Sequence, residues 1–308
     1  MKKKLLSSAL LLLTAMIWGF AFVAQVKGME SVGTYTYNGL RFLIGGAVML
    51  PLFLIRPKKE KRDRRKLRAS MLYGVPAGLL LFTASTLQQY AIELSPDANS
   101  MKAGFITGLY TVAVPVIGFL FMKKKTAVTT WIGSAAALAG LYLLCAAGES
   151  GFDYTDGMLL LSVPVWACHI LFIDRFGHSS DAFVLSGIQY AVCGGLSLVC
   201  AVFFDAGSLN AQAIGAALLP ILYGGILSVG VGFTLQTIGQ KGADPTVAAI
   251  IMSTESMFGA IGNLLFLSVS MSPIQYVGCL LLFAGIVVSQ IPVRGRKKAE
   301  AIDRRKFP

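Results

Sequence analysis

The stretch LLSSALLLLTAMIWGFAFVAQV, residues 5–26, follows three lysines and contains no charged residue. A helix needs about 20 mainly apolar residues to cross the hydrocarbon core of a membrane, so this segment is long enough to span it. A cleaved signal peptide has an apolar core of roughly 7–15 residues and a small-residue cleavage site, which is not evident here. We therefore interpret residues 5–26 as an uncleaved first membrane span.

Nine further apolar stretches follow in the remaining chain. Of its 308 residues, 55% are hydrophobic and 14% are charged, and the mean hydropathy is +0.69. A soluble domain carries about 25% charged residues, so the composition excludes an ordinary cytosolic enzyme and a disordered chain. The sequence predicts an all-α integral membrane protein with ten transmembrane helices. Their predicted ranges are 5–26, 34–55, 69–91, 97–122, 127–147, 157–173, 182–204, 213–237, 245–268 and 272–292.

The basic residues predict the orientation of these spans. If the N-terminus is placed in the cytoplasm, all but three of the 27 Lys and Arg residues fall in cytoplasmic segments. The exceptions are Lys27, Arg41 and Lys102. This bias is typical of the positive-inside rule, and it explains the net charge of +12 without nucleic acid. We expect a multi-pass protein of a bacterial plasma membrane with both termini cytoplasmic and the lipid bilayer as its partner.

The two halves of the chain share an ordered series of weak matches. A shift of 148 residues relates Trp18 to Trp166, Arg41 to Gln189 and Gln88 to Gln236. Beyond a three-residue deletion the shift is 145, and it relates Trp131-Ile-Gly133 to Tyr276-Val-Gly278 and Tyr110 to Glu255. We call two residues related in this way repeat counterparts.

The repeat predicts an inverted architecture. Each half holds five predicted spans, and this odd number places the second copy upside down in the membrane. Inverted repeats are typical of alternating-access carriers, whose substrate site lies near the midplane between the halves. We expect the first repeat at residues 1–147, the second at 157–292 and a basic cytoplasmic tail at 293–308.

Four motifs resemble those of EamA-type members of the drug/metabolite transporter superfamily, and the resemblance covers about residues 8–292. They are Ile17-Trp18-Gly19, Arg41-Phe42, the stretch SMKAGFITGLYTVAVP at residues 100–115, and PTVAA at residues 245–249 followed by Thr254-Glu255. The resemblance implies ten helices, cytoplasmic termini, and export or exchange of small metabolites.

The chain departs from the family pattern at two places. Ser256 stands where the family usually has proline, so we expect a straighter ninth helix. Before the last span the family often has Gly-Glu, whereas this chain has Ser268-Val-Ser270-Met. Any role of that second glutamate is therefore absent.

Charged side chains inside spans are costly and are by default candidates for function. Glu255 lies near mid-depth, and we interpret it as a proton-exchanging group or a contact for a cationic substrate group. Alternatively, it hydrogen-bonds a neighbouring helix without titrating. Its counterpart Tyr110 is predicted at a similar depth. Arg41 and Lys102 lie in the outer parts of their spans and either attract carboxylates or extend to the head groups.

Other polar and aromatic residues complete the candidate site. Lys102 with Thr107 and Tyr110 is expected to line an outer vestibule. Trp18 and Trp166 are expected either to form cavity walls or to pack between helices. Gln88 and Gln236 carry amides that either bind substrate or join helices.

The sequence favours a secondary carrier over other classes. It contains no nucleotide-binding motif, and we expect no cofactor. The five cysteines form no C-x-x-C pair, so we expect neither a disulfide framework nor a metal site. His169 and Asp174 form H-x-x-x-x-D, which leaves an acyltransferase-like membrane enzyme as the alternative. We expect a small-metabolite exporter or exchanger, for example of amino acids. A monomer is sufficient, and a homodimer, the substrate and the coupling ion stay open.

Overall fold

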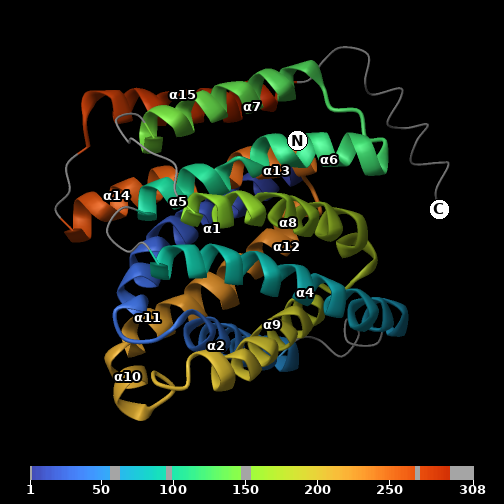
Figure 1. The fold of residues 1–308 in the computed structure, drawn as a ribbon. Coiled ribbons are helices and arrows are strands. Elements are labelled where there is room, and N and C mark those ends of the chain that lie inside the picture. The colour runs from blue at the N-terminus through green and yellow to red at the C-terminus, as the bar shows by residue number, and fades with distance from the viewer. Residues whose placement is uncertain (1, 56–62, 95–98, 147–153, 268–270, 292–308) are drawn as a thin grey trace.

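The computed structural model describes residues 2–55, 63–94, 99–146, 154–267 and 271–291. Within these ranges the chain forms helices and contains no β-strand. The long helices run side by side across Figure 1, with their ends at two opposite faces of the molecule. The prediction of an all-α fold is confirmed.

The described part of the first half, residues 2–146, contains six α-helices and a short π-helix. They are α1 (Lys2–Met29), α2 (Thr34–Ile55), α4 (Arg64–Leu94), α5 (Asn99–Gly108), α6 (Tyr110–Met122), α7 (Val128–Leu141) and the π-helix η1 (Tyr142–Ala146).

The described part of the second half, residues 154–291, includes a longer π-helix. Its elements are α8 (Tyr154–Phe176), the 3₁₀-helix η2 (Gly177–Ser179), α9 (Ala182–Phe204), α10 (Ala211–Ala216), α11 (Leu218–Leu222), the π-helix η3 (Tyr223–Phe233), α12 (Thr234–Gln240), α13 (Pro245–Met252), α14 (Glu255–Leu267) and α15 (Pro273–Ser289).

Seven helical segments in the described ranges are long and apolar enough to cross a membrane. Two shorter apolar helices cover Val128–Leu144 and Pro273–Ser289. Large apolar side chains such as Phe121, Phe203 and Leu219 are mostly exposed on the outer surface of the bundle. An apolar exterior of this kind is what a bilayer requires, and the chain is consistent with a multi-pass membrane protein.

Helices at equivalent positions of the two halves pack against each other at opposite edges of the bundle. α2 packs along α9 at one edge, and α7 packs along α15 at the other (Figure 1). Ideal Cβ atoms on Gly133 and Gly285 would lie 2.6 and 2.7 Å from each other's carbonyl oxygen. Gly140 and Gly278 show the same reciprocal approach at 2.6 and 2.7 Å. These glycines let the backbones of α7 and α15 touch.

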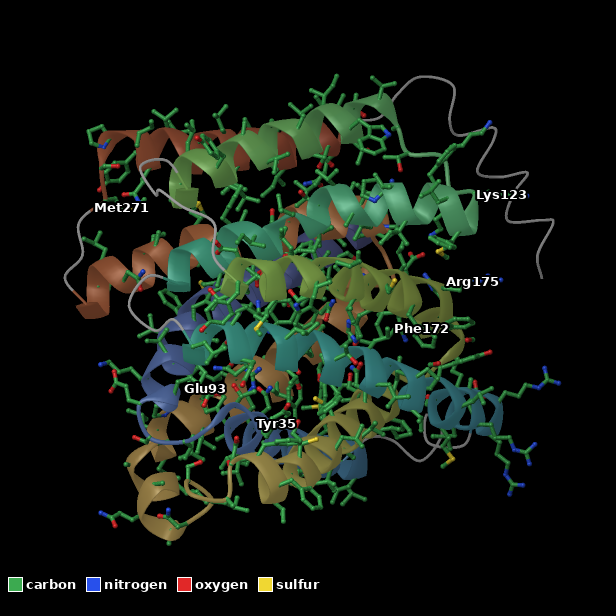
Figure 2. All side chains as sticks on the ribbon, in the orientation of Figure 1. Tyr35, Glu93, Lys123, Phe172, Arg175 and Met271 are labelled. Carbon is green, nitrogen blue, oxygen red and sulfur yellow. The ribbon has the colours of Figure 1, made fainter. Side chains whose placement is uncertain are left out.

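Basic residues gather at one end of the bundle. Figure 2 places Lys123 and Arg175 at this end, and Tyr35 and Glu93 at the opposite end. Lys124, next to Lys123 at the end of α6, forms an ion pair with Asp174 of α8. This contact joins the two halves of the chain at the basic end.

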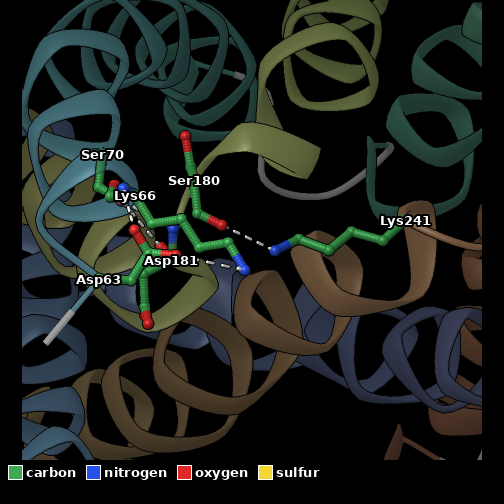
Figure 3. Close-up of polar contacts among 6 residues, drawn as sticks. All are labelled: Asp63, Lys66, Ser70, Ser180, Asp181 and Lys241. Atoms are coloured by element: carbon green, nitrogen blue, oxygen red, sulfur yellow. Dashed lines mark hydrogen bonds and ion pairs between the residues drawn. The ribbon is translucent and has the colours of Figure 1, made fainter. Parts of the chain in front are cut away.

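A polar cluster at the same end connects helix α4 with the loop before α9 and with Lys241, which follows α12 (Figure 3). The backbone N–H of Asp181 donates to Ser70 Oγ at 2.9 Å, which joins the start of α9 to α4. Lys241 Nζ donates to the carbonyl oxygen of Ser180 at 3.0 Å. Asp181 also caps α9 by accepting from the backbone N–H of Phe183 at 3.0 Å.

Two helical segments are interrupted at equivalent positions. α5 ends and α6 begins around Leu109, and α13 and α14 are separated by Ser253 and Thr254. The hydroxyls of Ser253 and Thr254 donate to the carbonyl oxygens of Ile250 and Ile251 at 2.9 and 2.7 Å. The ninth span is thus interrupted although it has no proline at residue 256, and the expectation of a straighter ninth helix stays a prediction.

We predict that Gly133→Ala lowers the free energy of unfolding by roughly 1–3 kcal/mol, because its Cβ would meet backbone atoms of α15. Thermal unfolding of the purified protein in detergent measures this. The matched control is Gly187→Ala in α9, where a Cβ would meet nothing within 4 Å. Equal unfolding temperatures for the two variants would contradict the close packing of α7 and α15.

Candidate functional site

A cavity lies between the halves and is walled by α1, α2, α4, α5, α6, α8, η3, α12, α13 and α14. The space between its walls, with its open mouth included, is about 530 Å³. Fourteen residues line it: Trp18, Phe22, Gln25, Arg41, Gln88, Thr107, Tyr110, Trp166, Ile170, Ser228, Phe233, Gln236, Met252 and Glu255.

The structure brings together eight of the nine residues that the sequence singled out. They are Trp18, Arg41, Gln88, Thr107, Tyr110, Trp166, Gln236 and Glu255. The side chain of the ninth, Lys102, lies outside the described residues. This placement shows a shared cavity, and the roles of its residues stay predictions.

Most of the wall consists of repeat counterparts. Ten of the fourteen lining residues form five pairs, each with one member from either half. The pairs are Trp18 and Trp166, Phe22 and Ile170, Gln88 and Gln236, Thr107 and Met252, and Tyr110 and Glu255. The cavity is thus built from equivalent positions of the two halves.

Tyr110 and Glu255 meet each other across the cavity. The Tyr110 hydroxyl donates to Glu255 Oε1 at 3.2 Å, and both side chains are at most 5% exposed. Each is the first residue after a helix interruption, Tyr110 at the start of α6 and Glu255 at the start of α14.

Arg41 is a buried cation with no carboxylate partner in the described part of the chain. Arg41 is 4% exposed, and its Nε atom finds no hydrogen-bond partner in the described segments. The guanidinium carbon lies 5.2 Å from the ring centre of Tyr37 and 5.1 Å from that of Phe42. These rings hold the cation by cation–π attraction without neutralising it. The alternative in which Arg41 extends to the head groups does not fit this burial.

Phe233 connects the aromatic residues of the cavity. Its ring centre lies 4.6 Å from that of Trp18 and 6.1 Å from that of Trp166, which is stacked on it at 14°. The ring centres of Phe42 and Tyr190 lie 6.0 and 6.3 Å from that of Phe233. Phe233 therefore touches side chains from α1, α2, α8 and α9 at once.

The amides of the cavity differ in how they are bonded. Gln88 Nε2 donates to the Thr107 hydroxyl at 3.0 Å, which joins α4 to α5. Within the described ranges, Gln25 Oε1 and Gln236 Oε1 have no hydrogen-bond partner, although both residues are buried. Buried amide oxygens without partners are uncommon in proteins, and they are available to a ligand that donates hydrogen bonds.

His169 and Asp174, the residues of the enzyme alternative, have separate partners. His169 is fully buried and contacts Gln189 at 3.0 Å between Nε2 and Oε1, whereas Asp174 pairs with Lys124. His169 and Asp174 are five positions apart on α8, so their side chains point in directions about 140° apart around the helix axis. Within the described ranges, no three His, Cys, Asp or Glu side chains are placed to hold a metal ion.

Sequence analysis did not select six of the lining residues. Met252 could have been found as the repeat counterpart of Thr107, and Phe22 and Ile170 as the counterparts that lie one turn after Trp18 and Trp166. Gln25 is an amide in a predicted span, like Gln88. Ser228 and Phe233 had no such signal, because they lie in the π-helix η3, which hydropathy does not reveal.

A family model described as the EamA-like transporter family matches residues 5–146 and again residues 154–290. The chain belongs to this family. The two matches cover nearly the whole chain, including all the residues that line the cavity. The resemblance drawn from the four sequence motifs is confirmed.

Similar proteins are named as transporters. The threonine/homoserine exporter RhtA of Escherichia coli is 26% identical over 305 residues, which are 96% of this chain and 94% of RhtA. A protein of Archaeoglobus fulgidus named an uncharacterized transporter is 26% identical over 292 residues, 94% of this chain and 88% of its own length. A crystal structure with 20% identity has a TM-score of 0.73 and covers 98% of this chain and 99% of its own. That likeness concerns the fold alone.

We predict that Tyr110→Phe destabilises the protein by roughly 1–3 kcal/mol, because Glu255 Oε1 then loses its hydrogen-bond donor in a buried site. Thermal unfolding of Tyr110→Phe, Glu255→Gln and the double variant measures the coupling between the two residues. The matched control is Tyr142→Phe, whose side chain is 53% exposed. Strictly additive effects of the two substitutions would show that the contact contributes nothing.

Proposed function

We propose that the protein is a secondary carrier that moves small metabolites such as amino acids across a bacterial plasma membrane by alternating access. The observation that carries the proposal is the cavity lined by five pairs of repeat counterparts. A site shared by equivalent positions of two halves opens to one side when one half rearranges and to the other side when its counterpart does.

The proposed architecture is ten membrane crossings arranged as two inverted five-helix repeats. The reciprocal glycine contacts support it, because Gly133 is the counterpart of Gly278 and Gly140 is the counterpart of Gly285. Gly133 meets Gly285 in the same way that Gly278 meets Gly140. The double match of one family model to the two halves also supports this architecture.

The proposed orientation places both termini in the cytoplasm. It is supported by the gathering of Lys123, Lys124 and Arg175 at one end of the bundle, as the positive-inside rule expects for the cytoplasmic face (Figure 2). Glu93 lies at the other end. There it accepts a hydrogen bond from the backbone N–H of Thr34 at 3.1 Å.

The charges of the cavity fit an amino acid. Arg41 offers a buried cation to a carboxylate, and Glu255 with the free amide oxygens of Gln25 and Gln236 offers acceptors to an ammonium group. RhtA, a relative that covers nearly the whole chain, is named as an exporter of threonine and homoserine. Export or exchange of a similar zwitterion is therefore the proposed activity.

We assign coupling to Glu255, which exchanges a proton as the carrier changes state. Its only hydrogen-bond partner in the described structure is the Tyr110 hydroxyl, which donates to the carboxyl group from the other half. Protonation of the Glu255 carboxyl group removes its negative charge and so changes how Oε1 accepts hydrogen bonds from Tyr110 and from a substrate ammonium group. A monomer suffices for this mechanism, because one chain supplies the whole wall of the cavity.

We predict that purified protein in proteoliposomes moves threonine or another amino acid, and that an imposed proton gradient changes the rate. In Glu255→Gln, which keeps the shape and removes the ionisable group, transport no longer responds to the gradient. The assay is the flux of labelled solute from a mixed pool with and without the gradient. The matched control is Glu93→Gln, the same substitution outside the cavity, which keeps the response.

The outcomes separate the parts of the proposal. Transport that ignores both the gradient and the substitution would leave a facilitator and remove the coupling role of Glu255. An absence of flux for every solute in the pool would contradict the carrier assignment. Turnover of an acyl donor by the purified protein would then favour the enzyme alternative based on His169.

A further inference from the structure

The two tryptophans of the cavity are repeat counterparts, but their indole groups are bonded differently. Trp18 Nε1 donates to the carbonyl oxygen of Ser228 at 3.1 Å. Trp166 Nε1 has no hydrogen-bond partner among the residues that the structure describes, although Trp166 is only 9% exposed and lines the cavity. An indole N–H is a donor only, and it nearly always finds an acceptor when it is buried.

The π-helix η3 accounts for the bonded member of the pair. Ser228 lies within η3, and η3 packs against α1, which carries Trp18. An ideal Cβ on Gly232 would lie 2.6 Å from Trp18 Nε1, so this glycine makes room for the indole. The Gly232 carbonyl oxygen accepts from Thr14, one turn before Trp18, at 3.3 Å. The widened turn of η3 thus offers α1 two carbonyl groups.

The equivalent segment of the first half is an ordinary α-helix within α4. An ideal Cβ on Gly78 would lie 2.9 Å from the carbonyl oxygen of Gln189. An ideal Cβ on Gly225 would lie 3.1 Å from the carbonyl oxygen of Arg41. Because Arg41 and Gln189 are counterparts, Gly78 and Gly225 occupy equivalent places, 147 residues apart.

The register then changes by one residue along η3. Gln88 and Gln236 both line the cavity and are 148 residues apart, so the second half has one residue more between Gly225 and Gln236. A single inserted residue is what converts an α-helical turn into a π-helical one, often at a functional site. The helix α8, which carries Trp166, therefore packs against an α4 without the widened turn that holds Trp18.

We propose that the free indole N–H of Trp166 binds an anionic oxygen of the transported substrate, whereas Trp18 acts only by positioning α1 against η3. The inference deepens the proposed function and rests on it. Arg41 lines the same cavity and carries its unpaired positive charge, so a carboxylate is the acceptor that both donors fit. Trp166 is then a specificity-determining residue for acids over amines.

The test compares Trp166→Phe with Trp18→Phe, two substitutions that keep an aromatic ring and remove the N–H. Uptake is measured for amino acids and for the corresponding amines that lack the carboxylate. Trp166→Phe is expected to raise the apparent KM for the acids about tenfold and to leave that for the amines within about twofold. Trp18→Phe is expected to change acids and amines by the same factor. Trp131→Phe, remote from the cavity wall, changes neither.

A binding measurement keeps the test independent of transport. In the Trp18→Phe/Trp131→Phe variant Trp166 is the only tryptophan, since the chain contains three. Its fluorescence in the purified protein is expected to change with a mixture of common amino acids and short organic acids, and not with the decarboxylated amines. No change with any of these probes, or equal changes with acids and amines, overturns the inference.

The two proposals fail in different ways. A fluorescence response to acids without any flux leaves the role of Trp166 standing and contradicts the carrier. Flux with the same acid preference in Trp166→Phe and wild type leaves the carrier standing and overturns the role of Trp166.

Discussion

A polypeptide surrounded by hydrocarbon has no water to bond its peptide groups, so its backbone must be satisfied inside helices or by nearby side chains. Helix interruptions are therefore tolerated only where other groups take over. In this protein the hydroxyls of Ser253 and Thr254 bond carbonyls of α13 at such a place. The interruptions at Leu109 and at Ser253 lie directly before Tyr110 and Glu255, so this constraint places both residues at the cavity.

Much of the fold and most of the polar site could be predicted from the sequence. Long apolar stretches indicate helices because hydrocarbon requires them, and a charged residue such as Arg41 or Glu255 inside a stretch indicates a cavity because exposure to lipid is costly. The π-helix η3 could not be predicted in this way. Its inserted residue leaves the hydropathy of the segment unchanged, and so Ser228 and Phe233 carry no signal until the backbone is known.

The site combines a symmetric frame with an asymmetric lining. Counterparts such as Gln88 and Gln236 occupy equivalent positions, yet Gln88 bonds Thr107 while Gln236 Oε1 has no hydrogen-bond partner among the described residues. Arg41 Nε likewise has no partner there, whereas Oε1 of its counterpart Gln189 contacts His169 Nε2. An asymmetric ligand needs donors and acceptors at fixed, different places. The different bonding of the two members of each pair provides that difference within a repeated backbone.

Phe233 shows how the frame and the lining are linked. It lies in η3 and touches both Trp18 and Trp166, which belong to different halves of the chain. Packed interiors respond to movement by changing between discrete arrangements, since close-packed rings leave little room for gradual adjustment. A movement of α1 relative to α8 must therefore repack Phe233. Ser228 shares η3 with Phe233, and Trp166 is stacked on the Phe233 ring, so the packing of Phe233 is linked to the geometry that the cavity wall offers to a ligand.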